Sequence, residues 1–271
     1  MAGAAAREAP PRRKRFGQHF LHDPAVIARI VRAVDPHGDD HLVEIGPGRG
    51  ALTAPLLAQH THSLDAIEID RDLAARLRER FAATPGFRLH ESDALEFDYA
   101  ALAHERGGRL RIVGNLPYNI STPLLFRLLG AAAGIIDLTV MLQREVAARL
   151  AARPGARGYG RLAVMLAPLA EVSWLFAVGP GAFQPPPKVW SAVVRIAMRA
   201  APAFAVSPNY AAVVATAFAQ RRKTLRNALS QLLQREQISA CGIDPGARPE
   251  TLAPQAFNTL AQALDRARGG R

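Results

Sequence analysis

The residues LVEIGPGRGALT, at positions 42–53, contain a short hydrophobic run, a turn with three glycines and the start of a helical pattern. The run LVEI is typical of a buried strand, and 51–59 has the composition of a helix. Gly46, Gly48 and Gly50 allow the backbone to turn sharply and to approach a ligand closely where the strand ends. This order of strand, glycine turn and helix predicts the first unit of a parallel α/β sheet.

This turn differs from the loops that bind phosphate groups. Its spacing is GxGxG rather than GxGxxG, and no GK[ST] sequence follows it, which excludes a P-loop. Pro47 restricts the backbone of the turn. The turn alone is also compatible with a purely structural role, so its meaning depends on the residues that follow the other strands.

The same alternation continues along the chain. Strand-like runs occur at 64–70, 87–91, 109–115 and 135–143, and helical patterns at 24–34, 72–82, 121–129 and 144–151. This alternation predicts a mostly parallel sheet with helices on both faces. Two further runs, 172–178 and 191–198, are separated by too few residues for a helical crossover. We expect them to form an antiparallel pair at the sheet edge.

The strand pattern stops after Pro202, and residues 208–271 have the pattern of several helices separated by turns. We therefore expect three parts. Residues 1–15 are expected to be a basic, mobile N-terminal segment, residues 16–203 an α/β domain, and residues 204–271 a small all-helical C-terminal domain.

The charge of the chain is strongly positive and unevenly distributed. The 34 Lys and Arg exceed the 23 Asp and Glu, which gives a net charge of +11. Residues 40–98 hold 11 acidic and 6 basic side chains, whereas residues 200–271 hold 4 acidic and 9 basic ones. A basic surface favours a polyanionic partner, most often nucleic acid. The alternative is an Arg-rich composition without such a partner.

The composition also bears on the compartment and on metals. Cys241 is the single cysteine, which excludes an internal disulfide framework and a cysteine-based zinc site and fits a reducing compartment. The eight histidines are scattered, so we expect no metal. No uncharged apolar run approaches the roughly 18 residues of a membrane span, and the N-terminus lacks the apolar region of a secretory signal. These features predict a cytoplasmic protein.

Acidic residues follow the second and third strands. Glu68 and Asp70 end the run 64–70, and Asp93 follows the run 87–91. A carboxylate after the second strand suits a ribose diol, because it accepts hydrogen bonds from two hydroxyls, and Asp93 could accept from the exocyclic amine of a nucleoside. Each acid is individually compatible with a helix N-cap, and the pattern does not choose between Glu68 and Asp70. Together they favour a nucleoside site at the carboxyl edge of the sheet.

The tetrapeptide NLPY, at 115–118, follows the fourth strand. The exocyclic amine of adenine is a poor nucleophile because its lone pair is delocalised into the ring. Two acceptors, the side-chain oxygen of Asn115 and the carbonyl of Leu116, can hold its hydrogens and expose the lone pair, and they stabilise the developing positive charge. Tyr118 offers an aromatic plane for an unstacked base. An ordinary strand-to-helix turn is the alternative.

Two further sets of side chains also have structural alternatives. The run Arg221, Arg222 and Lys223, with Arg226, is compatible with a solvated helix face, but on a chain of this charge we expect contacts with the phosphates of structured RNA. We expect Trp174 and Trp190 to pack in the core or at the sheet edge rather than to stack on bases.

Several segments together resemble the ribosomal RNA adenine dimethyltransferases, and the bacterial small-subunit enzymes most of all. The resemblance implies a Rossmann-like S-adenosylmethionine methyltransferase domain with a small helical C-terminal domain. The matching segments occur in one order over most of the chain: KRFGQHFL (14–21), EIGPGRGALT (44–53), IEIDRDLA (67–74), SDAL (92–95), GNLPYNISTPLLF (114–126), MLQREVAARL (141–150), FQPPPKVWSAVVR (183–195) and RRKTLRN (221–227).

The resemblance assigns cofactor contacts to individual residues. It implies that His19 and Leu21 lie against the cofactor and that Gly46 lies at its methionine end. It implies that Glu68 binds the ribose and that Asp93 reads the adenine of the cofactor. Members of the family commonly have Asn where this chain has His19.

The resemblance also assigns residues to the target base. Asn115 matches the residue at the junction of methyl donor and target amine, where it serves both cofactor binding and catalysis. Phe183 matches an aromatic residue that holds the base opposite Tyr118.

The function implied is N6-dimethylation of two adjacent adenosines in the 3′-terminal hairpin loop of 16S ribosomal RNA in the small subunit, contributing to ribosome biogenesis. The donor is S-adenosylmethionine, and we expect a monomer without metal or membrane. One alternative is the large-subunit dimethyltransferase of antibiotic resistance, which more often has a serine in the glycine turn, where this chain has Pro47, and lacks RRKTLRN. Another is a non-catalytic RNA-binding assembly or transcription factor of the same fold.

Overall fold

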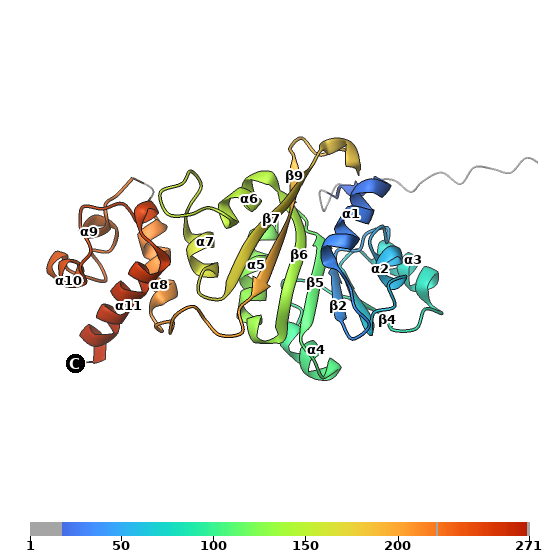
Figure 1. Ribbon diagram of the computed structural model, residues 1–271, viewed down its shortest axis with the longest axis horizontal. Helices are drawn as coiled ribbons and strands as arrows, with labels where there is room; N and C mark the ends of the chain where they lie inside the picture. The colour runs from blue at the N-terminus through green and yellow to red at the C-terminus, as the bar shows by residue number, and fades with distance from the viewer. Residues whose placement is uncertain (1–17, 221, 270–271) are drawn as a thin grey trace, which may run out of the picture.

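A seven-stranded sheet forms the centre of the α/β part of the molecule (Figure 1). The computed structural model describes residues 18–220 and 222–269. In the sheet the strand order is β4-β3-β2-β5-β6-β9-β7. The strands are β2 (His41–Ile45), β3 (Ser63–Glu68), β4 (Phe87–Glu91), β5 (Leu110–Asn115), β6 (Ile135–Gln143), β7 (Ala170–Val178) and β9 (Ser191–Met198).

Strands β2 to β6 run parallel, and β9 lies antiparallel between β6 and β7. The mostly parallel sheet and its antiparallel edge pair are therefore confirmed. Because the five parallel strands share one direction, their carboxyl ends meet at one edge of the sheet. The antiparallel β9 begins at that same edge, where Ser191 pairs with Gln143 at the end of β6.

Helices cover both faces of the sheet, as alternation along the strands requires. Val43 and Ile45 of β2 belong to a core that α4, α5 and α6 complete, whereas Leu42 faces a second core with α1 and α2. The helices of this part are α1 (Pro24–Val34), α2 (Thr53–Leu57), α3 (Arg71–Phe81), α4 (Tyr99–Arg106), α5 (Ser121–Gly130), α6 (Arg144–Leu150) and α7 (Arg161–Leu166).

The local signals at helix ends behave as their chemistry predicts. The Asp23 carboxylate accepts from the amides of Ala25 and Val26, and Pro24 occupies the first turn of α1. The sequence analysis did not predict α4, although its ends carry clear signals. Asp98 caps its N-terminus, and Gly107 ends it in the left-handed conformation.

A short two-stranded sheet joins distant parts of the chain. Strand β1 (Phe20–Leu21) pairs antiparallel with β8 (Phe183–Gln184), so that Leu21 lies opposite Phe183. The amide of His22 also donates to the carbonyl of Ala182 at 3.0 Å. The N-terminal residues of the described chain are thereby held against the β7–β9 connection.

The C-terminal helices form a separate core at one end of the molecule (Figure 1). They are α8 (Tyr210–Phe218), α9 (Leu225–Ala228), α10 (Arg235–Ala240) and α11 (Pro254–Gly269). This core includes Ala163 and Val164 of α7, and the hydroxyl of Tyr210 donates to the Val164 carbonyl at 2.8 Å. The domain division at 203/204 stays a prediction, since α7 packs with helices on the far side of it. The predicted basic segment 1–15 lies outside the described residues.

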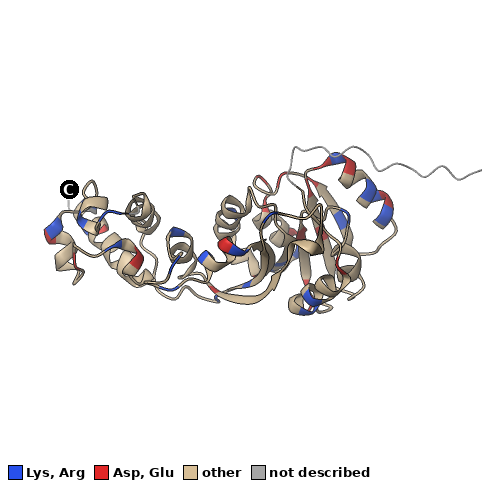
Figure 2. Ribbon diagram, turned by 90° about the horizontal axis from the view of Figure 1, so that it is seen from above, with Lys and Arg blue, Asp and Glu red and all other residues tan. Residues whose placement is uncertain are grey.

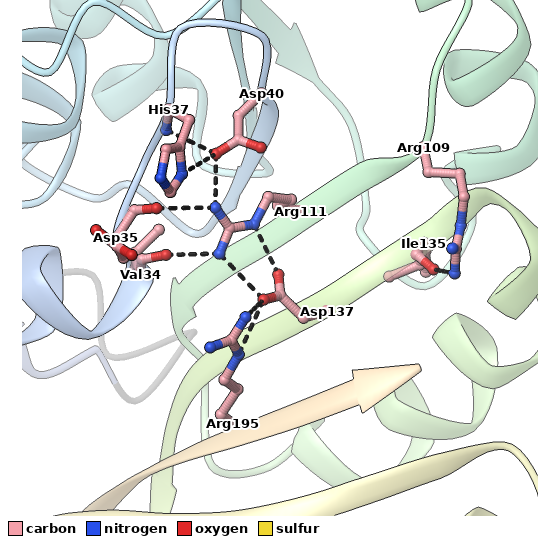
Figure 3. Close-up of polar contacts among 9 residues, drawn as sticks. All are labelled: Val34, Asp35, His37, Asp40, Arg109, Arg111, Ile135, Asp137 and Arg195. Atoms are coloured by element: carbon pink, nitrogen blue, oxygen red, sulfur yellow. Dashed lines mark hydrogen bonds and ion pairs between the residues drawn. The ribbon is translucent and has the colours of Figure 1, made fainter. Parts of the chain in front are cut away.

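A buried ionic network lies at the amino end of the central strands (Figure 3). The Arg111 guanidinium, 7% exposed, donates to Asp137 at 3.0 Å and to Asp40 at 2.6 Å. It also donates to the carbonyls of Val34 and Asp35 at the end of α1, at 2.6 and 3.1 Å. Arg195 of β9 also donates to the Oδ2 of the buried Asp137 carboxylate, at 2.6 Å. One guanidinium thus connects β5, β6, α1 and the start of β2.

Arg111→Ala should lower the free energy of unfolding by about 3–5 kcal/mol, because it leaves buried carboxylates and helix-end carbonyls without their donor. Urea denaturation measures this change. The control is Arg88→Ala, which removes an exposed pair with Glu105 and should cost no more than about 1 kcal/mol. Equal effects of the two substitutions would contradict the central position given to Arg111.

Candidate functional site

A cavity of about 380 Å³ opens at the carboxyl edge of the parallel strands. That volume lies in the range of small-molecule sites. Its walls come from the segment 18–21, the glycine turn after β2, the ends of β3 and β5 and the loop after β4. Of the residues predicted for the site, it brings together His19, Leu21, Gly46, Glu68, Asp93, Asn115, Leu116 and Tyr118.

Two glycines give the backbone its shape around the cavity. Gly48 has φ +58°, and a Cβ there would lie 3.1 Å from the ring of Phe20. A Cβ on Gly114 would lie 2.5 Å from the Ile45 carbonyl oxygen, so only glycine allows β5 to approach β2 this closely just before Asn115. The glycine turn also holds Gly46, whose amide donates to the Ile67 carbonyl at 3.0 Å.

The structure gives the two acids after β3 different environments. The Glu68 carboxylate lines the cavity and accepts from the amides of Gly48 and Asp70 at 3.0 and 2.9 Å. Burial raises its pKa above the ordinary value, against the effect of these backbone donors. The Asp70 carboxylate instead caps α3 by accepting from the amides of Asp72 and Leu73, outside the cavity lining.

Glu44 is a cavity residue that the sequence analysis did not single out. Its side chain is buried beside the glycine turn, and Thr53 donates to it at 2.6 Å. Burial raises its pKa to about 7, which the Thr53 hydroxyl partly opposes and the Glu68 charge reinforces. The signal was available, because Glu44 is the single charged residue in the hydrophobic run LVEI. Its carboxyl can gain a negative charge when a cation enters the cavity.

Asp93 also lines the cavity, in the loop after β4. Its Oδ1 accepts from the Leu95 amide at 2.8 Å. This contact orients the carboxylate by a local turn, as short acidic side chains commonly do. Its position past the end of β4 agrees with the expected meeting of strand ends.

The NLPY segment brings a side-chain amide to the edge of the cavity. The Nδ2 of Asn115 donates to the His19 carbonyl at 3.0 Å. Among the described residues, the Oδ1 of Asn115 has no hydrogen-bond partner. The contact with His19 therefore orients the amide with its acceptor available to a ligand. The Leu116 amide donates to the Met141 carbonyl at 3.1 Å, which fixes the turn against β6.

The Tyr118 side chain is held by its hydroxyl and lies beside the ring of His19. Its hydroxyl lies 2.6 Å from the Oγ of the buried Ser191, and its ring centroid is 5.8 Å from that of His19. Burial raises the pKa of Tyr118. His19 in turn donates from Nδ1 to the Pro185 carbonyl at 2.8 Å. The hydroxyl thus positions the ring that faces the cavity.

Two predicted sets of residues lie away from this cavity. Phe183 is 2% exposed, packs in the core opposite Leu21 and does not line the cavity, so its assigned contact with a target base stays a prediction. Arg222, Lys223 and Arg226 are exposed around the start of α9, which lies at the far end of the molecule from α2 (Figure 1). Arg221 lies outside the described residues.

The Glu44 carboxyl predicts a pH-dependent stability. Its pKa is about 7 when folded and near its ordinary value of 4.5 when unfolded, so it stabilises the fold below pH 4.5 and loses this contribution as the pH rises to 7. The free energy of unfolding of Glu44→Gln should therefore rise by about 2–3 kcal/mol relative to that of the parent chain as the pH is raised from 5 to 8. Urea denaturation across this range measures the gain, with the exposed Glu145→Gln as control. If the difference in unfolding free energy between Glu44→Gln and the parent chain does not vary with pH, the raised pKa of Glu44 is refuted.

Comparison with known proteins agrees with this geometry. A family model described as ribosomal RNA adenine dimethylase matches residues 11–266. The chain is 56% identical over 253 residues to ribosomal RNA small subunit methyltransferase A of Nitrosococcus oceani, covering 92% of this chain and 95% of the relative. It is 52% identical to the protein of the same name from Pseudomonas aeruginosa, covering 96% and 97%.

Solved structures show the same fold. A 23S rRNA methyltransferase, ErmE, superposes with a TM-score of 0.71 at 29% identity, covering 91% of this chain and 99% of that one. A dimethyladenosine transferase from Plasmodium falciparum superposes with a TM-score of 0.76 at 22% identity, covering 92% and 98%. The family match extends over both the cavity and the C-terminal helices. The chain belongs to the ribosomal RNA adenine dimethylase family and has its Rossmann-like methyltransferase fold.

Proposed function

We propose that this enzyme transfers methyl groups from S-adenosylmethionine to the N6 atoms of two adjacent adenosines in the 3′-terminal hairpin loop of 16S ribosomal RNA in the small subunit. The observation that carries the proposal is the Asn115 amide, held by His19 with its oxygen available at the edge of a nucleoside-sized cavity. An acceptor in this place suits a substrate group that carries a hydrogen, as an amine does, rather than a phosphate oxygen.

The residues of the cavity fit the cofactor. Glu68, partly desolvated, would accept from the two ribose hydroxyls, and Asp93 from the amine of the cofactor's adenine. Gly46 would lie at the methionine end of the cofactor, where the Glu44 carboxylate can balance the cofactor's positive charge. When bound, the cofactor supplies an electrophilic methyl group. No metal is part of the proposal, and among the described residues no three His, Cys, Asp or Glu side chains gather as a metal site.

The chain's own residues prepare the target amine. The Asn115 side-chain oxygen and the Leu116 carbonyl accept from its two hydrogens, which draws the nitrogen toward a tetrahedral shape and exposes its lone pair. Neutral acceptors stabilise the positive charge that develops on that nitrogen. Tyr118 supplies a plane on which the unstacked base lies. The proton is lost to water after the methyl group has moved, so no side chain acts as a strong base.

The small subunit is favoured over the large subunit as the source of the RNA. Relatives named for the small subunit share 50–56% identity with this chain, against 29% for the 23S enzyme. The expected monomer stays a prediction, as does its place in the cytoplasm. Within the described residues, no helix is long and apolar enough to cross a membrane.

The RNA surface is proposed to extend onto the C-terminal helices. Lys and Arg lie on these helices as well as on the α/β part (Figure 2). Arg222, Lys223 and Arg226 are exposed there, and charge on this face would bind phosphates outside the reacting loop.

The choice between the two acids is tested by cofactor binding. Glu68→Ala should weaken binding of S-adenosylmethionine by tenfold or more, since charge-assisted hydrogen bonds contribute about 1.5–3 kcal/mol. Asp70→Ala is the matched control, because Asp70 caps α3 outside the cavity. Calorimetric titration compares the two variants. Equal affinities would show that the ribose acid is misassigned.

The proposed reaction is tested by single-turnover methylation of unmethylated small subunits with labelled cofactor and mapping of the modified bases. Asn115→Ala should reduce turnover by about 10²–10³, the effect of losing one oriented polar group, with RNA affinity nearly unchanged. Tyr118→Ala should lose about 1–3 kcal/mol of stacking. Tyr118→Phe should retain most activity, its loss limited to the anchor on Ser191. A Tyr118→Phe variant as inactive as Asn115→Ala would refute this mechanism.

The role of the basic run is tested by the salt dependence of RNA binding. Replacing Arg221, Arg222 and Lys223 with Ala should weaken binding and flatten the slope of log K against log[salt] by up to about three units. Cofactor affinity should stay constant, because Arg222 and Lys223 lie away from the cavity. If the slope does not change, these residues form a solvated face and the RNA binds elsewhere.

A further inference from the structure

Trp190 is the most exposed large hydrophobic residue in the described part of the chain. Its side chain is 51% exposed, and that of the neighbouring Val189 is 44% exposed. Trp190 was expected to pack in the core or at the sheet edge, and its exposure excludes the core. Single exposed hydrophobic residues are common, but a half-exposed tryptophan beside an exposed valine is a feature of binding surfaces.

The position of Trp190 is fixed by its neighbours. Its carbonyl accepts from the Arg144 amide at 2.9 Å. Its six-membered ring packs over Gly179, where a Cβ would lie 3.6 Å from the nearest ring carbon. A methyl group at Gly179 would thus meet the indole at ordinary van der Waals distance. The indole is thus supported from one side by backbone while much of its surface remains open.

Trp190 also lies beside the reacting end of the site. The next residue, Ser191, is the anchor of the Tyr118 hydroxyl at 2.6 Å, and Tyr118 lines the cavity. Ser191 pairs with Gln143 at the carboxyl edge of the sheet. Trp190 therefore stands one residue from the contact that holds the proposed platform for the target base.

The charge around Trp190 is positive. Arg144, whose amide donates to the Trp190 carbonyl, and Lys188, two residues before Trp190, are both exposed. Residues 141–199 contain two acids, Glu145 and Glu171, and each is paired with an arginine, Arg149 or Arg199. An aromatic plane near exposed cations, in a segment whose two acids are both paired, matches single-stranded RNA, whose bases stack on aromatic rings while its phosphates bind Lys and Arg.

We propose that Trp190 stacks on the base of a loop nucleotide next to the target adenosine, with Arg144 and Lys188 on the adjoining phosphates. This proposal rests on the RNA methylation proposed above and adds a second aromatic platform outside the cavity. Holding the neighbouring base would keep the loop open while the target base lies against Tyr118. Trp190 is then a positioning residue that reads the loop rather than the reacting amine.

Fluorescence provides a direct test, because the chain has two tryptophans. Trp174→Phe leaves Trp190 as the single tryptophan, and Trp190→Phe leaves Trp174, which is 39% exposed on the edge strand β7. An RNA hairpin with the small-subunit loop should quench the first variant and leave the second nearly unchanged. Anisotropy of labelled RNA confirms binding in both. Bound RNA without quenching of Trp190 would overturn the proposal.

Binding measurements identify the contact as stacking. Trp190→Ala should weaken hairpin binding by about 5- to 150-fold and raise KM with kcat largely retained, whereas Trp190→Phe should recover most of the loss and Trp174→Ala should have no effect. An abasic nucleotide on one side of the target should weaken the parent chain and have little further effect on Trp190→Ala. If the losses in binding caused by the abasic nucleotide and by Trp190→Ala add in full at both flanking positions, the proposal is overturned.

Two outcomes are separable from these. If the parent chain does not methylate the RNA, the proposed function is refuted. The stacking contact is not refuted by that result, because RNA binding and fluorescence quenching still report it. A change in sedimentation of Trp190→Ala without a change in RNA binding would show that Trp190 contacts protein, and would overturn the proposal.

Discussion

The buried Arg111 guanidinium is the contact on which the arrangement of the central strands depends. It reaches Asp137 of β6, Asp40 before β2 and the last carbonyls of α1. A charge this deeply buried is tolerated only when its partners are in place, so the network admits one register of these elements. Asn115 lies at the other end of the same strand, β5. The network that orders the amino end of the sheet therefore also sets the position of the reacting end.

At the carboxyl edge, contacts between distant parts of the sequence complete the site. The His19 carbonyl orients the Asn115 amide, the Pro185 carbonyl holds the His19 ring, and Ser191 holds the Tyr118 hydroxyl. Pairing of β1 with β8 brings His19 and Pro185, which adjoin these strands, close to each other. Asn115 and Asp93 thus each have one side-chain contact to the protein and one oxygen left for a ligand.

Much of this arrangement could be predicted from local patterns. Hydrophobic runs and glycine and proline signals located the strands, and the rule that parallel strands end at one edge placed the acids after β3, Asp93 and Asn115 together. The choice of Glu68 over Asp70 came from the family resemblance. What could not be predicted depends on long-range contacts. Burial decides that Glu44 has a raised pKa, a two-residue pairing brings Phe183 beside Leu21, and the support of Gly179 leaves Trp190 open to solvent. The run 64–70 was predicted too long, because Asp70 leaves the strand to cap α3.

The orientation of the Asn115 amide also bears on where the proposed reaction ends. With its Nδ2 on the His19 carbonyl, the side chain presents an oxygen, which needs a hydrogen on the substrate nitrogen. Adenine offers two such hydrogens, the monomethylated base one and the dimethylated base none. Each transfer therefore removes a partner of the site, and an oriented acceptor with no donor is poorly satisfied once both methyl groups are in place. The same contact that prepares the amine thus favours release of the finished, dimethylated product.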